Sequence, residues 1–128
     1  MSDSPYKILL FMKRRPGMST AEFRDYYENH HRILAEKYST NAIKRYVRRY
    51  IEPIAGARTD DMWFDVLSEV WIEDKAVFEA VTAFLAKNEP PPDVKEDEFK
   101  LFDRDMMRVA TVVEYESDVS QYPATLSE

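Results

Sequence analysis

The sequence predicts an α+β fold in which four strands form an antiparallel sheet and the helices lie on one face of that sheet. Two patterns support this prediction. Apolar residues recur at three- and four-residue spacing in residues 19–38 and 73–88, which is typical of amphipathic helices. The segments around these stretches are short and rich in β-forming residues, which is typical of strands.

The chain length indicates the number of domains. With 128 residues, the chain can bury a hydrophobic core without disulfides or metal. We therefore expect one domain over residues 1–128, with an ordered core at about residues 6–116 and a polar tail at residues 117–128.

The first half of the chain predicts a strand, a helix and a second strand. Residues 6–13 (YKILLFMK) are a short apolar run between turn residues, as expected of a buried strand. Ser19 precedes Glu22 by three residues, the pattern of a capping box at a helix start. The apolar stripe of this helix contains Phe23, Tyr26, Tyr27, His30, Ile33, Leu34 and Tyr38. A second strand is predicted over residues 42–51, and a loop is predicted over residues 52–63.

The second half predicts a strand, a helix, a further helical stretch and a last strand. Residues 64–72 (FDVLSEVWI) alternate, so that Asp65, Leu67, Glu69 and Trp71 share one face of the strand. A helix follows from residue 73 and ends before the three prolines at 90–92. Residues 94–105 continue a helical pattern, and residues 106–115 predict the last strand. This order is the ferredoxin-like split βαβ arrangement.

The open face of the predicted sheet indicates a partner. Its third strand contributes two acids, a leucine and a tryptophan, a mixture that favours a covered polar cavity over a solvated surface. Two sheets meeting face to face around a two-fold axis would enclose that cavity. We therefore expect a homodimer with a small-molecule pocket in each subunit.

Composition argues against several classes of function. The net charge of −6 disfavours nucleic acid as a partner, and no apolar run is long enough to span a membrane. The sequence has no cysteine and no glycine-rich phosphate loop, and the adjacent His30 and His31 would point about 100° apart on a helix and could not share one metal ion. We therefore expect no cofactor and no metal, and a cytoplasmic location by default.

Three stretches of the sequence resemble a known family. The first, LLFMKRRPGMSTAEFRDYYENHHRILAEKY, is similar to the opening of the EthD family of dimeric α/β barrels, whose pattern has a histidine eight residues after the phenylalanine. Counted from Phe23, that histidine is His31. LSEVWIEDKAVFEA and EDEFKLFDRDMMRVATVVEY resemble later segments of the family, and Asp103 matches its aspartate before the last strand. The resemblance spans residues 6–116 and implies a ferredoxin-like dimeric α/β barrel.

Three residues are the candidate catalytic groups. His30 lies near the centre of the helical stripe, which predicts a packed side chain, whereas His31 lies about 80° from Phe23, at the edge of the stripe. At that edge an imidazole could reach a cavity and transfer protons. Asp65 and Glu69 share a strand face, and if both line a cavity, at least one should have a raised pKa.

The same acids have a simpler interpretation. They could form ion pairs at a wet edge of the sheet with Arg45, Arg48 or Arg49.

Six further residues are candidate substrate contacts: Phe11, Tyr27, Tyr46, Tyr50, Trp71 and Asp103. The aromatic members could form the apolar wall of a pocket, or they could pack within the dimer. Asp103 could orient a histidine, or it could cap a turn.

The resemblance implies a class of chemistry. Family members with proposed activities are similar to cofactor-free decarboxylases and dehydratases that act on aromatic polyketides. We therefore expect a cofactor-independent lyase with His31 as the acid/base group. Two alternatives stay open: a cofactor-free monooxygenase, and a non-catalytic protein that binds a small hydrophobic ligand.

Overall fold

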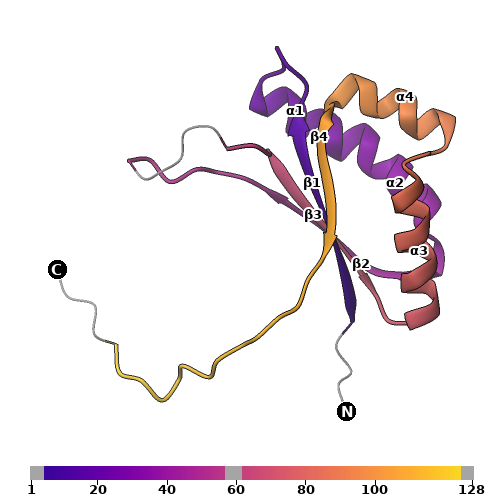
Figure 1. Cartoon of the computed structure of the whole chain (residues 1–128). Coiled ribbons are helices and arrows are strands. Elements are labelled where there is room, and N and C mark those ends of the chain that lie inside the picture. The colour runs from indigo at the N-terminus through magenta and orange to yellow at the C-terminus, as the bar shows by residue number, and fades with distance from the viewer. Residues whose placement is uncertain (1–4, 57–61, 125–128) are drawn as a thin grey trace.

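The computed structural model describes residues 5–56 and 62–124 and confirms the predicted fold class. Four strands form one antiparallel sheet in the order β2-β3-β1-β4. Their bounds are Tyr6–Arg14 for β1, Ile43–Tyr50 for β2, Val66–Ile72 for β3 and Phe102–Thr111 for β4. The helices lie on one side of this sheet, and the other side is open (Figure 1).

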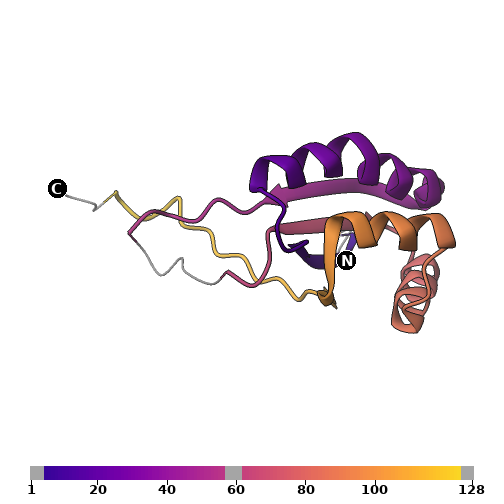
Figure 2. The ribbon, with the colours of Figure 1, turned by 90° about the horizontal axis from the view of Figure 1, so that it is seen from above.

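The helical segments follow the predicted order. Between β1 and β2 run α1 (Thr20–Tyr26), the π-helical turn η1 (Tyr27–His31), α2 (Arg32–Ser39) and the 3₁₀ turn η2 (Thr40–Ala42). Between β3 and β4 run α3 (Lys75–Lys87) and α4 (Pro92–Leu101). Seen from above, the helices lie together at one end, and the described residues of the β2–β3 connection and of the C-terminal segment extend away from them (Figure 2).

The capping box at the start of α1 is confirmed. The Ser19 hydroxyl accepts a hydrogen bond from the backbone N–H of Glu22 at 3.1 Å, and the Glu22 carboxylate accepts one from the backbone N–H of Ser19 at 2.8 Å. These two bonds pair backbone donors that a helix start otherwise leaves free. They fix the direction in which α1 leaves the turn after β1.

The wide turn η1 overturns the predicted environments of the two histidines. His30 is exposed and stacks on Tyr26 with ring centroids 4.6 Å apart, whereas His31 is buried. The prediction assumed an α-helix throughout, in which each residue rotates by about 100°. In η1 the Arg32 N–H bonds to the carbonyl of Tyr27, five residues back, and such a turn rotates less per residue. The smaller rotation brings His31 into line with Phe23 and Tyr27.

The last strand begins earlier than predicted. Helical spacing through Phe99 and Phe102 predicted a helix to residue 105, but α4 ends at Leu101 and β4 starts at Phe102. The Leu101 carbonyl accepts a hydrogen bond from the Arg15 N–H at 2.8 Å, and Phe102 pairs with Arg14. Pairing with β1 thus overrides the local helical pattern. The strand correspondingly ends at Thr111, before the predicted end at Tyr115.

The hydrophobic core lies between the sheet and the helices. Its buried members are Met12, Phe23, Tyr27, Val66, Leu101 and Phe102. The three aromatic rings meet edge to face, with centroids 5.9–6.2 Å apart. Every polar group that this core contains must find a partner inside it.

Two predicted segments lie partly outside the described residues. The predicted loop 52–63 includes residues 57–61, and the predicted tail 117–128 includes residues 125–128, none of which the structure describes. Within the described residues, none of the helices has the length and apolar character needed to cross a bilayer.

Candidate functional site

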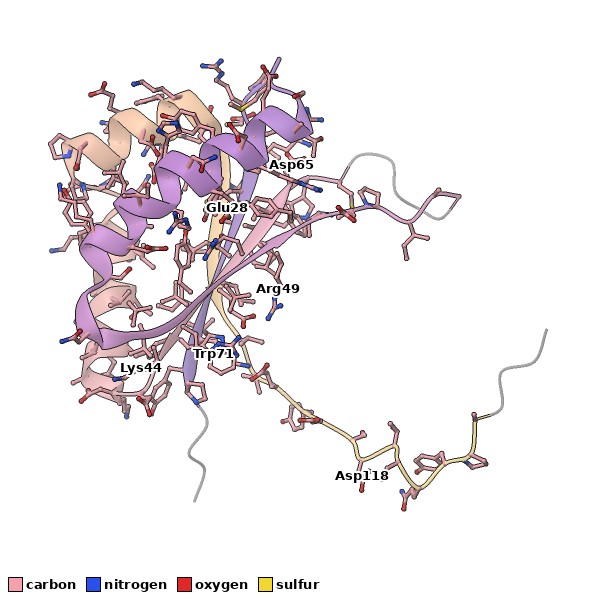
Figure 3. The ribbon with its side chains drawn as sticks, turned by 180° about the vertical axis from the view of Figure 1, so that it is seen from behind. Glu28, Lys44, Arg49, Asp65, Trp71 and Asp118 are labelled. Atoms are coloured by element: carbon pink, nitrogen blue, oxygen red, sulfur yellow. The ribbon has the colours of Figure 1, made fainter. Side chains whose placement is uncertain are left out.

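The sheet separates the predicted site residues into two groups. Tyr27, His31, Tyr46 and Tyr50 lie on the helix side, in or against the core. Cross-strand pairing places Phe11, Glu69, Trp71 and Asp103 on the open side. The predicted single pocket, walled by Asp65, Glu69 and Trp71 and edged by His31, is therefore wrong, because the sheet lies between its parts. Figure 3 shows Trp71 and Arg49 on the side away from the helices.

His31 is held by a carboxylate of α4. Its ring is 7% exposed, and Nδ1 lies 2.8 Å from Oδ2 of Asp97. Asp97 also accepts a hydrogen bond from the Tyr26 hydroxyl at 2.7 Å. The edges of Tyr27 and Phe102 flank the imidazole, with centroids 4.8 and 5.1 Å from it. A carboxylate and two aromatic rings thus fix the orientation of the histidine.

The electrostatics of this group assign its protons. Burial works to raise the pKa of Asp97, but hydrogen bonds from His31 and Tyr26 outweigh it and hold that pKa below its usual range. Burial, and then the bond to Asp97, raise the pKa of Tyr26 to about 12, so its hydroxyl remains a donor. An ionised Asp97 accepts from Nδ1–H, which leaves Nε2 as the nitrogen free to exchange a proton.

Asp97, the partner of His31, is a candidate site residue that the sequence did not single out. The sequence predicts that Asp103 orients a histidine or caps a turn, but Asp103 lies within β4, opposite Lys13, on the other side of the sheet from His31. A signal for Asp97 exists in α4. Val94 and Leu101 are inward positions, and Asp97 has the same helical spacing between them. An acid at an inward helix position needs a partner.

Three hydroxyls form a second polar cluster beside His31. The Tyr27 hydroxyl lies 2.7 Å from that of Tyr46 and 2.6 Å from that of Ser68. Burial raises the pKa of Tyr27 to about 12 and also raises the pKa of Tyr46. All three groups are therefore protonated at neutral pH, and each pairs with another inside the core.

Glu28 joins the helix to β2 at the edge of this cluster. Its carboxylate accepts bonds from the Arg48 guanidinium at 2.6 and 3.0 Å and from the Tyr50 hydroxyl at 2.5 Å. The Arg48 hydrogen bond is the main reason that the pKa of Glu28 lies below its usual range. Arg48 is thus committed to Glu28 and is not a partner of Asp65 or Glu69.

The two predicted catalytic acids form ion pairs. Glu69 accepts bonds from Arg49 at 3.1 Å and from the Trp71 indole N–H at 2.6 Å. Burial works to raise the pKa of Glu69, but these bonds outweigh it and lower that pKa, so Glu69 does not have the raised pKa that would mark an acid lining a cavity. Asp65 instead pairs with β1: its carboxylate lies 3.3 Å from Nε of Arg14 and also accepts a hydrogen bond from the Arg14 backbone N–H at 2.8 Å.

The aromatic residues of the open side have neighbours of their own. Phe11 packs against Trp63 and Phe64, with centroids 5.3 and 5.2 Å away. The cations of Lys7 and Arg45 each lie 4.4 Å from the centroid of Trp71. The open side therefore presents a basic and aromatic surface rather than an acidic cavity.

A hollow of about 260 Å³ lies at the outer edge of β2. It is open to solvent, unlike the enclosed pocket predicted from the sequence, and Lys44, Arg45, Tyr46 and Arg48 contribute to its lining. Tyr46 connects it to the core, because the Tyr46 hydroxyl bonds to Tyr27 and the Tyr27 ring contacts His31. Glu36 also contributes to the lining, Arg48 is paired with Glu28, and Lys44 lies 3.6 Å from Glu73. Among the described residues, no three His, Asp or Glu side chains gather as a metal-binding group.

Comparison with known proteins places this chain in a family. Two structures of the Arabidopsis thaliana protein At3g17210 have the same fold: a crystal structure with a TM-score of 0.52 and 15% identity, and a solution structure with 0.51 and 14%. The crystal-structure match covers 89% of this chain and 99% of the other, and the solution-structure match 92% and 96%. None of the curated proteins matches. The EthD domain model matches residues 15–105, well over half of the chain, and the protein therefore belongs to the EthD family.

Proposed function

We propose that this protein is a small-molecule enzyme that transfers protons without a cofactor, with His31 as the acid/base group and Asp97 as its positioning residue. The observation that supports the proposal is the 2.8 Å contact between His31 Nδ1 and Asp97, buried beside aromatic rings. Such a contact fixes one tautomer of the imidazole and directs its proton exchange to Nε2.

The same imidazole serves two lyase reactions. Loss of carbon dioxide from a β-keto acid leaves an enolate that needs a proton, and dehydration needs a proton removed beside a carbonyl. We assign the substrate to the aromatic or polyketide-like class because Tyr27 and Phe102 flank His31. Lys44 and Arg45 in the hollow would bind a carboxylate or enolate oxygen, with Tyr46 between them and the core. Asp65 and Glu69 serve as ion-pair partners in this proposal.

Turnover by matched variants tests the proposal. The protein is incubated with a panel of aromatic β-keto acids and hydroxyketones, and products are followed by mass spectrometry. We expect His31→Ala to lower kcat by about 10²- to 10⁴-fold, the usual contribution of a general acid/base group. His30→Ala, an exposed neighbour, is the control and should retain full activity. Equal rates for His31→Ala and the parent protein would contradict the catalytic role.

Asp97→Asn separates positioning from packing. The amide keeps the shape of the carboxylate but removes its charge, so we expect a lower kcat and a displaced pH profile with a nearly unchanged KM. A change in thermal stability alone, with an unchanged pH profile, would show that Asp97 is structural. Oxygen consumption during turnover would instead favour the cofactor-free monooxygenase.

A second candidate function is binding without catalysis. The observation that favours it is the open hollow beside Tyr46, which a small anionic compound can enter without any movement of His31. In that case the panel gives no products, and calorimetry detects a ligand whose affinity falls in Arg45→Ala and is unchanged in His31→Ala.

We also propose that two copies pair through the open sides of their sheets in the cytoplasm. The partly buried apolar residues Leu9, Phe11, Val47 and Leu67 line this side without a helix over them. A second sheet would cover them and close a barrel.

A further inference from the structure

The C-terminal segment leaves the body of the protein as an extended arm. After β4 ends at Thr111, residues 112–124 run outward without joining a helix or strand (Figures 1 and 2). Large side chains on this arm are exposed: 81% for Val113, 96% for Tyr115 and 66% for Tyr122. Apolar and aromatic groups that a chain leaves uncovered in a row are typical of a surface that meets a partner.

The arm has a local structure that presents these side chains. Asp118 accepts hydrogen bonds from the Ser120 backbone N–H at 3.0 Å and from its hydroxyl at 2.6 Å. The Tyr122 N–H bonds to the carbonyl of Val119 at 3.1 Å, which closes a turn. At its base, Glu114 pairs with Lys7 of β1 at 2.9 Å. An ion pair therefore holds the base of the arm on β1, and hydrogen bonds fold its outer part into a turn.

The charges of the arm and of β2 are complementary. Residues 112–128 contain the acids Glu114, Glu116, Asp118 and Glu128 and no basic residue. Strand β2 has the sequence IKRYVRRY, with basic residues and no acid. Lys44, Arg45 and Arg49 are its exposed cations, and Lys44 and Arg45 also line the hollow. Arg49 pairs with Glu69 at 3.1 Å, and Lys44 lies 3.6 Å from the exposed carboxylate of Glu73. Figure 3 shows how far Asp118 lies from Lys44 of the same chain. The basic strand therefore matches an acidic arm other than its own.

The topology brings the arm of one copy to β2 of another. Strands β2 and β4 are the two edges of the sheet. When two such sheets meet face to face around a two-fold axis parallel to their strands, β4 of each copy lies against β2 of the other. The arm continues directly from β4, so it starts beside the partner's β2.

We propose that the C-terminal arm of each copy docks along β2 of a second copy, with Glu116 and Asp118 against Lys44 and Arg45, while Glu114 keeps the base of the arm on Lys7 of its own chain. The two-fold axis repeats this contact, so each dimer contains two docked arms. This inference rests on the proposed pairing of the open sheet faces. The arm adds a charged edge contact that reaches the rim of the hollow of the other copy.

A charge exchange tests the docking with full-length protein. One variant reverses the arm (Glu116→Lys with Asp118→Lys) and leaves Glu114 on Lys7, and a second reverses the strand (Lys44→Glu with Arg45→Glu). Arg49 is left unchanged because it holds Glu69. Sedimentation at micromolar concentration should give the parent protein a mass of twice 15.1 kDa. We expect each variant alone to dissociate at least tenfold more readily, and an equimolar mixture to recover the parent affinity, because only the mixed pair matches both arms to both strands.

The control reverses Glu96 and Lys100, an exposed pair on α4, and should leave association unchanged. Circular dichroism checks that every variant is folded. A dimeric parent whose arm and strand variants associate equally well would overturn arm docking while leaving the paired sheets intact. A monomeric parent would overturn the paired sheets as well. Weakened variants that fail to recover on mixing would show that the arm does not cross to a second copy.

Discussion

At the scale of single residues, the buried Asp97 carboxylate decides what His31 can do. It has two donors, His31 and Tyr26, and both contacts are shorter than 3 Å. Charge-assisted hydrogen bonds of this kind are about twice as strong as neutral ones and fix the donors geometrically. The same bonds connect η1 with α4, so one carboxylate both positions the imidazole and joins two helical segments. Stability and the proposed proton transfer are therefore linked at this residue.

The pKa of Asp97 predicts how that stability depends on pH. Its folded-state pKa lies below the ordinary value of 3.8, so its stabilising effect is fully present above that value and is lost as the pH falls through the folded pKa. We expect Asp97→Asn to lower the free energy of unfolding by about 1–3 kcal/mol at pH 5, with the difference from the parent shrinking towards pH 2. Urea titrations along this pH series measure it.

Asp105→Asn, at an exposed position of β4, is the matched control and should follow the parent at every pH. A stability difference for Asp97→Asn that is the same in acid as at pH 5 would contradict an ionised Asp97.

Of the pair His31 and Asp97, only His31 could be predicted from the sequence. His31 follows from the spacing to Phe23 in a family pattern, a relation within one helix. Asp97 is 66 residues further along the chain, and its neighbour Glu98 is equally buried and pairs with Arg104. Which acid of α4 meets the histidine depends on how two helices pack, and no local pattern contains that information.

At the scale of elements, the wide turn η1 carries one more residue than a regular helix would. The Arg32 N–H reaches back five residues to Tyr27, and Asn29 lies exposed within the turn. Removing Asn29 would change the spacing from Tyr27 to His31 from four residues to three, and three is also a same-face spacing on an α-helix. His31 would then still lie under Tyr27 and meet Asp97.

We therefore expect deletion of Asn29 to be tolerated, with a change in the free energy of unfolding within about 1 kcal/mol and retained helical circular dichroism. Deletion of Ala80, an exposed residue of the regular helix α3, is the matched comparison. It rotates Val81 and Leu85 by about 100° relative to Val77 and should destabilise by several kcal/mol. If chemical denaturation shows that both deletions lower the free energy of unfolding equally, η1 does not contain an extra residue that the helix can lose.

The order of the helices and strands could be predicted from the sequence. The direction in which some helical side chains point, and some element boundaries, could not. Alternation placed Leu67, Glu69 and Trp71 together on one face, and the structure confirms this. The helical wheel failed at His30 because a single wide turn changes the rotation of every residue that follows it. The start of β4 was predicted wrongly because Phe102 fits a helical spacing and a strand equally well, and only pairing with Arg14 selects the strand.

At the scale of the whole molecule, one side of the sheet holds the buried histidine and the other presents a basic, aromatic surface. The single pocket predicted from the sequence combined residues of both sides, because the apolar stripe of a helix does not indicate which face of the sheet it covers. Among the described residues of the open side, Lys7 and Arg45 flank Trp71, and Leu67 lies between Arg49 and Phe11 in the pairing of the strands. A charge introduced at Leu67 would therefore lie near the middle of any paired surface.

Leu67→Asp tests whether the open sides pair. Burying an unpartnered carboxylate in an interface is strongly unfavourable, so we expect the dissociation constant of the homodimer to rise by at least about tenfold, measured by sedimentation over a concentration series. Phe84→Asp, at a 48% exposed position on the helix side, is the control and should leave association unchanged. Thermal unfolding separates association from folding, because Leu67→Asp should still melt cooperatively as a monomer. If Leu67→Asp and Phe84→Asp give the same dimer affinity as the parent, the open side is not the interface, since no two-fold pairing of these sheets can leave Leu67 in water.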